Sequence, residues 1–180
     1  MSALLILLVL VGLVILYGVF LYNRFVKDRN TIDEAWSGID VQLKRRHNLI
    51  PNLVETVKGY AHHEADVLEK VTAQRTGGGI ANVNKQETEI SKALANVFAV
   101  AENYPNLKAN ENFLDLQKQL SEVEDQIQLA RRYYNGAVRI YNTRVESVPS
   151  NLIASFAGFT KREFFEIGAE EERAVPKVAF

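Results

Sequence analysis

The stretch FLDLQKQLSEVEDQIQLARRYYNGAVRIY, residues 113–141, decides the fold of this 180-residue chain. Apolar side chains recur in it at alternating steps of three and four residues, the spacing of one face of an α-helix. This seam consists of Phe113, Leu116, Leu120, Val123, Ile127, Ala130, Tyr134, Ala137 and Tyr141. Asn135-Gly136 is typical of a hairpin turn, but the seam continues through it, so we predict one long helix. Within that helix, Gly136 is expected to permit the close approach of another helix.

A second long helical pattern precedes the seam and covers about residues 26–75. Arg46 and His47 interrupt its apolar stripe just before Pro51, whose ring and missing N–H predict a kink near Leu49. The three glycines of residues 77–79 predict the first loop, because consecutive glycines make a helix unfavourable.

The remaining segments predict two shorter helices. One lies between the glycine loop and the seam, with Asn82 or Asn84 as its N-cap and Pro105 at its end. Residues 150–172 are apolar and aromatic enough to pack back as a short fourth helix, and residues 174–180 are expected to form an extended tail. Amphipathic helices joined by short loops, without an alternating strand pattern, predict an all-α fold, here an antiparallel four-helix bundle.

The N-terminal 23 residues carry no charge, and residues 3–22 read ALLILLVLVGLVILYGVFLY. At the helical rise these twenty residues span about 30 Å, the thickness of the hydrocarbon core of a bilayer. A cleaved signal peptide would need a basic N-terminal region and a small-residue cleavage site, and neither is present. We therefore expect an uncleaved transmembrane anchor helix in residues 1–25, a helical bundle in residues 26–173 and a tail in residues 174–180.

Positive charges follow the apolar segment and none precedes it. Arg24, Lys27 and Arg29 lie within a few residues of its end. The positive-inside rule then predicts a single-pass protein with its N-terminus outside and residues 24–180 in the cytoplasm.

The composition excludes several classes of protein. Lys and Arg number 21 against 22 Asp and Glu, a net charge of -1, whereas a dedicated nucleic-acid-binding protein would carry a basic excess. The absence of Cys excludes a disulfide framework, a thiolate zinc site, an iron–sulfur cluster and a cysteine nucleophile.

The three histidines do not match a known metal motif. His47, His62 and His63 fit neither His-Glu-x-x-His nor the Glu-x-x-His pattern of di-iron bundles. We favour solvated histidines, with a site shared by His62, His63 and carboxylates of another helix as the alternative. We therefore expect no catalytic residue, no metal, no cofactor and no enzymatic activity.

Two groups of charged residues are interpreted structurally. The carboxylates of the seam helix fall mostly on its solvent-facing side; they are Glu111, Asp115, Glu122, Glu124 and Asp125. For the basic run of residues 44–46 we favour solvation or salt bridges within the bundle over contact with anionic lipid or a partner.

The run Arg131, Arg132, Tyr133, Tyr134 and Asn135 combines aromatic rings with an amide beside the seam. Such groups must find hydrogen-bond partners when they are buried. Asn135 and Asn142 are seven residues apart and therefore share a face of the helix. We favour a role in setting helix register, as a buried Asn does in coiled coils, with a binding groove as the alternative.

Five segments of the chain are distinctive in combination: residues 30–36 (NTIDEAW), 45–60 (RRHNLIPNLVETVKGY), 131–142 (RRYYNGAVRIYN), 149–159 (PSNLIASFAGF) and 176–180 (PKVAF). Together they resemble the motifs of the LemA family of bacterial membrane-anchored helical proteins. At Gly136 the family usually has Ala, which we interpret as a minor packing change. The resemblance implies an N-terminal anchor in the bacterial cytoplasmic membrane, a cytoplasmic antiparallel four-helix bundle and no enzyme. It also implies membrane shaping, since a LemA-like branch is associated with the formation of magnetosome membranes.

Our leading hypothesis is a non-enzymatic membrane-anchored scaffold that self-associates and organises or remodels the cytoplasmic membrane. Its partners would be the lipid bilayer and further copies of itself, and no nucleic acid. The aromatic side chains Phe156, Phe159, Phe164 and Phe165 would be hard to justify as exposed groups in a monomer.

The alternative is a membrane-tethered adaptor that presents its bundle or its C-terminal tail to a partner protein. Val178 and Phe180, with the terminal carboxylate, have the arrangement that PDZ-type domains bind. We favour a tail folded onto its own bundle over this arrangement. The predicted interaction or family-motif residues are Arg131, Tyr133, Tyr134, Asn135, Asn142, Phe156, Phe159, Val178 and Phe180.

Overall fold

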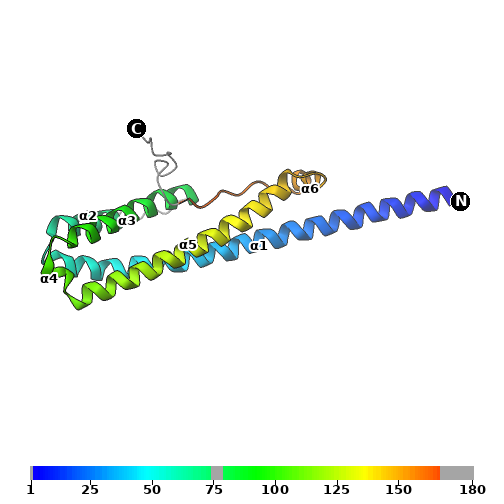
Figure 1. Ribbon diagram of the computed structural model, residues 1–180. Coiled ribbons are helices and arrows are strands. Elements are labelled where there is room, and N and C mark those ends of the chain that lie inside the picture. Colours follow the sequence, from blue (N-terminus) through cyan, green and yellow to red (C-terminus); the bar gives the residue numbers. More distant parts are fainter. Residues whose placement is uncertain (1, 74–78, 167–180) are drawn as a thin grey trace, which may run out of the picture. The chain divides into compact units, whose positions relative to one another are not determined.

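Every element of regular secondary structure is a helix in the residues that the computed structural model describes, 2–73 and 79–166. Helices make up 87% of this described part, so the all-α prediction is confirmed. Figure 1 labels the helices along the chain. The helices are α1 (Ser2–Lys58), α2 (His62–Ala73), α3 (Ile80–Ala101), α4 (Pro105–Lys108), α5 (Glu111–Glu146) and α6 (Ser150–Ala157).

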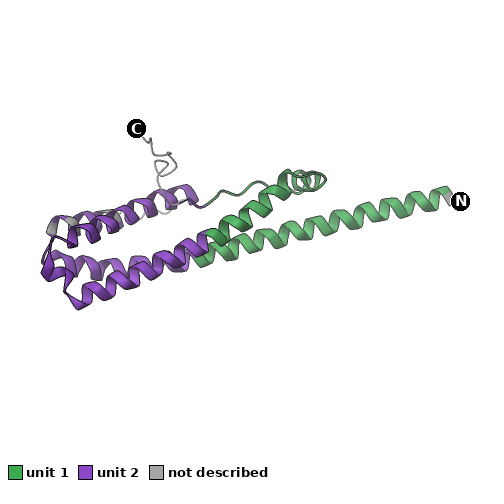
Figure 2. Cartoon of the chain, viewed as in Figure 1, with its two compact units in different colours: residues 1–38, 132–164 green, residues 39–131, 165–180 purple. Residues whose placement is uncertain are grey.

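The chain divides into two compact units, coloured in Figure 2. Unit 1 consists of residues 1–38 and 132–164, and unit 2 of residues 39–131 and 165–180. The long helices α1 and α5 are each divided between the two units, with one part of the helix in unit 1 and the other part in unit 2.

Unit 2 has a continuous apolar core to which α1, α2, α3, α4 and α5 all contribute. Large side chains buried in this core include Ile50, Leu53, Leu68, Ile90, Leu107 and Phe113. At the start of α5 the Oδ1 of Asn110 accepts a hydrogen bond from the N–H of Phe113, 3.2 Å away, as a helix N-cap does. From Phe113 to Ile127 the seam positions of α5 are buried, as their spacing predicts.

The core of unit 1 combines aliphatic side chains with several aromatic ones. Phe25 of α1 packs edge-on against Tyr141 of α5, with ring centroids 6.0 Å apart. Trp36 lies against Tyr134, at 5.6 Å between centroids. After Tyr134 the buried position is Val138 and not the predicted Ala137. An α-helix drifts by about 20° per heptad relative to a strict seven-residue repeat, which brings the next position into the core.

Asn135 and Gly136 lie inside α5, as predicted. The expectation that Gly136 permits a close helix approach is wrong. A Cβ atom added at Gly136 would have no neighbouring atom within 4 Å, so the space beside it is open.

The first long helix differs from its prediction at its end. Instead of one helix over residues 26–75, α1 continues through Pro51 to Lys58, and a break precedes α2. Proline removes one backbone hydrogen bond, a loss that a packed helix can absorb. At the break, the N–H groups of Tyr60 and Ala61 both donate to the carbonyl of Val57 at 2.9 Å. The predicted glycine loop falls largely on residues 74–78, outside the described residues.

Two predicted caps are also wrong. Asn82 and Asn84 lie inside α3, whose N-cap is Gly79 without any side-chain hydrogen bond. Pro105 does not end α3 but opens α4, since a first-turn position needs no N–H.

The fourth helix is shorter than the predicted residues 150–172. It ends at Ala157, because Gly158 adopts the left-handed conformation with φ 74°, which terminates helices. Residues 159–166 follow without regular secondary structure. The predicted tail, residues 174–180, lies outside the described residues.

Candidate functional site

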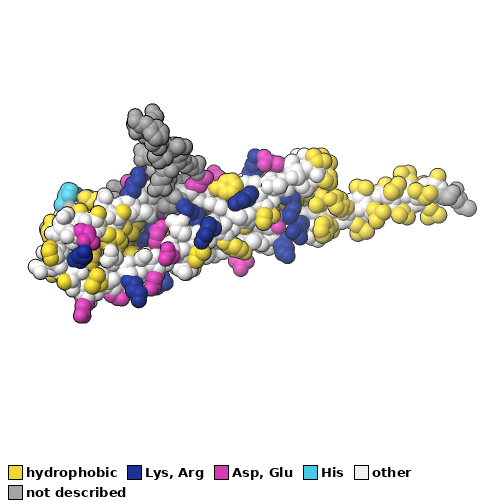
Figure 3. All heavy atoms as spheres, in the orientation of Figure 1, with side chains coloured by type: hydrophobic (Ala, Val, Ile, Leu, Met, Phe, Trp, Pro, Cys, Tyr) yellow, Lys and Arg dark blue, Asp and Glu magenta, His cyan; other side chains and the backbone are white. Residues whose placement is uncertain are grey.

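The first part of α1 is an apolar surface without a protein neighbour over most of its length. Its large side chains from Leu4 to Leu16 are exposed, and Figure 3 shows hydrophobic side chains covering this part of the helix. In the described residues it is the one helix long and apolar enough to cross a membrane. Exposed apolar surface of this extent indicates a site of contact with an apolar environment.

The end of this apolar surface is in contact with α6 and the segment that follows it. A Cβ atom at Gly18 would lie 3.6 Å from Cδ1 of Ile153. The ring of Tyr22 lies 5.6 Å from that of Phe159, which stacks on Phe25 with centroids 4.8 Å apart. Phe159 therefore joins the described core of unit 1 and is not a free contact for a second copy.

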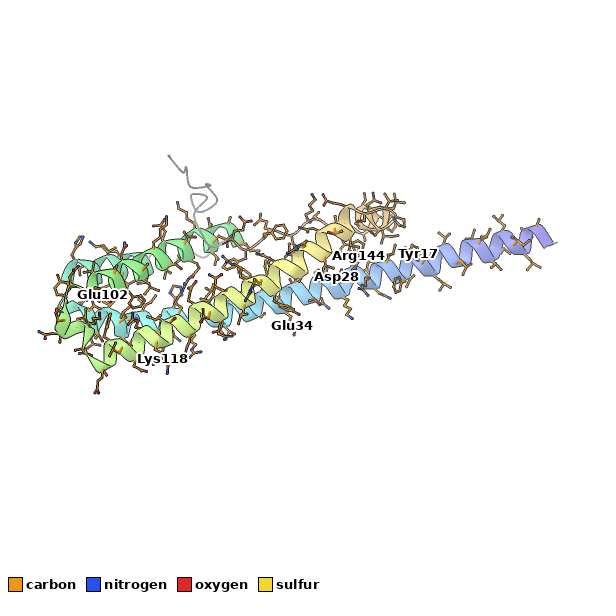
Figure 4. All side chains as sticks on the ribbon, in the orientation of Figure 1. Tyr17, Asp28, Glu34, Glu102, Lys118 and Arg144 are labelled. Carbon is orange, nitrogen blue, oxygen red and sulfur yellow. The ribbon has the colours of Figure 1, made fainter. Side chains whose placement is uncertain are left out.

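Ionic contacts begin directly beyond this aromatic group. Arg144 of α5 pairs with Asp28 of α1, and Figure 4 shows their side chains meeting between the two helices. Lys161 pairs with Glu146 at the far end of α5. The transition from apolar to charged side chains is thus sharp within unit 1.

Tyr134 and Asn142 of α5 hold the segment after α6. The Nδ2 of Asn142 donates to the carbonyl of Arg162 and its Oδ1 accepts from the N–H of Arg162, both at 2.9 Å. The Tyr134 hydroxyl donates to the carbonyl of Glu163 at 3.0 Å, and burial raises the pKa of this phenol. The polar groups of Asn142 are therefore used within its own chain, in bonds to the backbone of residue 162.

The other predicted residues are not brought together with these. Arg131 belongs to unit 2 and bonds to Gln128. Tyr133 is exposed, Asn135 is half-buried, and Phe156 is 93% exposed. Val178 and Phe180 lie outside the described residues.

Unit 2 contains a buried cluster of charged side chains around Arg46, which is completely buried. Its guanidinium pairs with Glu87 of α3. Its Nη1 also lies 2.8 Å from Oε2 of Glu124 and 3.0 Å from Oγ of Ser91. His47 Nε2 lies 3.2 Å from Oε1 of Glu87. This cluster links α1, α3 and α5 within unit 2.

Opposing influences act on the Glu87 carboxyl. Burial raises its pKa, but the hydrogen bond with His47 and the positive charge of Arg46 lower it more. The net pKa of Glu87 is lower than usual, so this group is ionised and accepts both partners at neutral pH.

The Arg46–Glu87 pair was missed by sequence reasoning, although a signal existed. Arg46 follows Leu43 by three residues and precedes Ile50 by four, which is the apolar spacing of α1. Glu87 precedes Ile90 by three, at the matching position of α3. Opposite charges at seam positions of two helices predict a buried ion pair. The salt-bridge interpretation of the basic run is confirmed for Arg46.

Glu124 also departs from its prediction, because it faces Arg46 and not solvent alone. Within the described residues, no three His, Asp or Glu side chains come close enough to hold a metal ion.

Together these features define an all-helical protein with a membrane-length apolar helix at its N-terminus. The chain belongs to the LemA family, whose sequence profile matches residues 35–180. The resemblance inferred from the sequence motifs is therefore confirmed.

Individual relatives carry two kinds of name. Magnetosome protein MamQ 2 of Paramagnetospirillum magneticum is 26% identical over 175 residues, covering 81% of this chain and 64% of the relative. Protein LemA of Metamycoplasma hominis is 26% identical over 139 residues, covering 73% and 63%. Magnetosome protein MamQ of Magnetospirillum gryphiswaldense is 23% identical over 174 residues, covering 80% and 64%. The chain thus spans less than two thirds of the length of these relatives.

Proposed function

We propose that this protein is a non-enzymatic, membrane-anchored helical scaffold that self-associates and organises or remodels the cytoplasmic membrane. One observation carries the proposal. The charge-free apolar segment continues within the same helix into the core of unit 1, where Leu21, Phe25 and Ile32 are buried. An anchor joined to a packed core without a flexible linker can transmit the orientation of the folded part to the bilayer.

For the folded part we propose an antiparallel four-helix bundle. In unit 1, the earlier α1 residue Phe25 contacts the later α5 residue Tyr141, and Trp36 contacts Tyr134. When two neighbouring helices are antiparallel, residue numbers increase along one helix while the numbers of the contacting residues decrease along the other.

We propose that the bundle lies in the cytoplasm, which the three cations Arg24, Lys27 and Arg29 support. Because the chain has no Cys, a single introduced thiol reports its own side of the membrane. In intact spheroplasts, Ser2→Cys should react with a membrane-impermeant maleimide, whereas Lys118→Cys should react only after lysis. Labelling of Lys118→Cys in intact spheroplasts would refute this orientation.

The names of the magnetosome relatives support the membrane-organising part of the proposal, as the family resemblance implies. These names describe the longer relatives, and for this chain a membrane-organising role is our proposal.

The mass of the full-length protein in mild detergent tests self-association. A large, defined assembly is expected, and charge reversals at its contacts should disperse it without unfolding the helices. Vesicles that bend or form tubules after reconstitution would indicate remodelling, and flat ones organisation only. A monomer, unchanged across a scan of exposed positions including Lys118→Glu, would refute the scaffold and favour the adaptor, which a pull-down with and without residues 178–180 then tests.

A further inference from the structure

A second charge-free segment lies far from the first in sequence. Residues 147–160 read SVPSNLIASFAGFT and contain no Asp, Glu, Lys, Arg or His. Apart from the N-terminal 23 residues, no charge-free stretch of the chain is as long. Since 24% of the residues are charged, such a gap requires an explanation. It coincides with α6 and the short connections on either side of it.

Two of the large apolar side chains of α6 are turned outward. Leu152 and Phe156, four residues apart and therefore on one face of α6, are 67% and 93% exposed. Val148, just before the helix, is 80% exposed. The buried positions of α6 are the small residues Ser150 and Ala154. A helix that packs only against its own protein would have the opposite distribution.

The position of α6 beside α1 identifies what covers this face. Ile153 meets Gly18 of α1, inside the apolar segment of residues 3–22, and Phe159 meets Tyr22 at its end. Gly18 lies four residues before Tyr22, or about 6 Å along the helix. Interfacial amphipathic helices are buried about 5–10 Å into the boundary between headgroups and acyl chains. These depths agree.

Charged side chains flank the segment on the side away from the apolar helix. The ion pairs Arg144–Asp28 and Lys161–Glu146 both lie in the same unit. Figure 3 shows Lys and Arg side chains beside the apolar tip of α6 on the viewed face. A charged edge next to an apolar tip matches the sequence of layers at a membrane surface.

We propose that residues 147–160, with Leu152 and Phe156 at their tip, insert into the leaflet at which the apolar segment of α1 ends. The occupant of the exposed face is lipid, and α6 is a second membrane contact beside the anchor. This inference rests on the proposed function only in requiring that α1 crosses the bilayer. It gives unit 1 two attachments to one membrane surface and thereby fixes its tilt.

Spin labels on the full chain test the proposal in vesicles of phosphatidylcholine and phosphatidylglycerol. Three single-Cys variants are compared by their accessibility to oxygen, which enters lipid, and to a neutral nickel chelate, which stays in water. Phe156→Cys reports α6, Leu10→Cys the anchor, and Tyr133→Cys an exposed aromatic position of the same unit on α5. All three positions are exposed, so the substitutions should leave the helices folded, which circular dichroism checks.

The expected result is a high oxygen-to-nickel ratio at Phe156→Cys and Leu10→Cys and a low ratio at Tyr133→Cys. Low accessibility to both reagents at Phe156→Cys would mean that protein, such as a second copy, covers it, and would overturn the proposal. High nickel accessibility would overturn it in favour of a solvated loop. If Leu10→Cys is also accessible to nickel, the anchor itself is wrong; if Leu10→Cys is in lipid, only this inference fails.

Discussion

Arg46 is completely buried, whereas arginine side chains ordinarily lie on the protein surface. A buried cation paired with a buried anion contributes little net stability, but the loss of either partner leaves an uncompensated charge. The neighbouring pair Lys44–Asp40, at 2.5 Å, is exposed and screened by solvent. The two pairs lie close in sequence and should respond very differently to mutation.

We predict that Arg46→Met and Glu87→Leu each lower the free energy of unfolding by about 3–5 kcal/mol, while the double variant regains most of this loss. Chemical unfolding followed by circular dichroism measures all three. As the matched control, Lys44→Met should change the free energy of unfolding by no more than about 1 kcal/mol. Additive losses in the double variant would contradict the pairing.

The lowered pKa of Glu87 has a consequence for stability in acid. The folded state binds this proton less tightly than the unfolded state, whose pKa is near the ordinary value of 4.5. The contribution of Glu87 is therefore complete above that pH and is lost as the pH falls through the lower, folded pKa. We predict that unfolding experiments between neutral and acidic pH give a flatter dependence for Glu87→Gln than for the wild type. Equal slopes would mean that Arg46 and His47 do not lower the pKa of this group.

Asn142 is the residue that attaches the segment after α6 to α5. Asn142→Ala removes both hydrogen bonds to the backbone of Arg162, and unpaired polar groups cost about 1–3 kcal/mol each where they stay buried. We predict faster trypsin cleavage after Lys161 and Arg162 in the folded protein. Tyr134→Phe, which removes one hydrogen bond, should have a smaller effect, and Tyr133→Phe none. Unchanged cleavage in Asn142→Ala would contradict this role.

At the scale of the elements, the existence of the helices could be predicted but not all of their ends. The three-four spacing predicted α5 correctly because its apolar face is buried along nearly its whole length. Pro51 predicts a kink and residues 77–79 predict the first loop, yet α1 ends at Lys58, directly before Gly59. A proline in a well-packed helix loses one hydrogen bond, whereas the break depends on packing that local sequence does not report.

Two glycines in helical elements should respond oppositely to alanine. Gly136 lies inside α5 with open space around it, so Gly136→Ala should stabilise the protein by about 0.5–1 kcal/mol. Gly158 ends α6 in the left-handed conformation, where a Cβ atom costs about 1–2 kcal/mol. Thermal unfolding of both variants measures the difference. If Gly136→Ala destabilised the protein, that result would contradict the open space around this residue.

At the scale of the molecule, the sequence predicted the apolar helix, the helical class and the family. It could not predict the division into units, because periodicity identifies which face of a helix is buried and not which helix covers it. For the same reason the Tyr134–Glu163 and Asn142–Arg162 contacts could not be assigned, although burial of Tyr134 and Asn142 could be expected.

Each unit has its own buried core, and hydrogen exchange should detect this. We predict that Arg46→Met accelerates amide exchange in α2 and α3 of unit 2 while exchange in residues 134–142 of unit 1 is nearly unchanged. Mass spectrometry of proteolytic fragments measures both regions in one sample. Equal acceleration in both regions would mean that the units unfold together.

The division of the chain also sets an order for synthesis. Most of unit 2 is one continuous stretch, residues 39–131, whereas unit 1 joins residues 1–38 to residues 132–164. A ribosome that makes the chain from its N-terminus releases the apolar helix first, and the contacts of unit 2 become available before those of unit 1. Phe25 and Trp36 therefore cannot contact Tyr141 and Tyr134 until more than half of the chain has been translated after them. The aromatic contacts of unit 1 therefore form only after most of unit 2 has been synthesised.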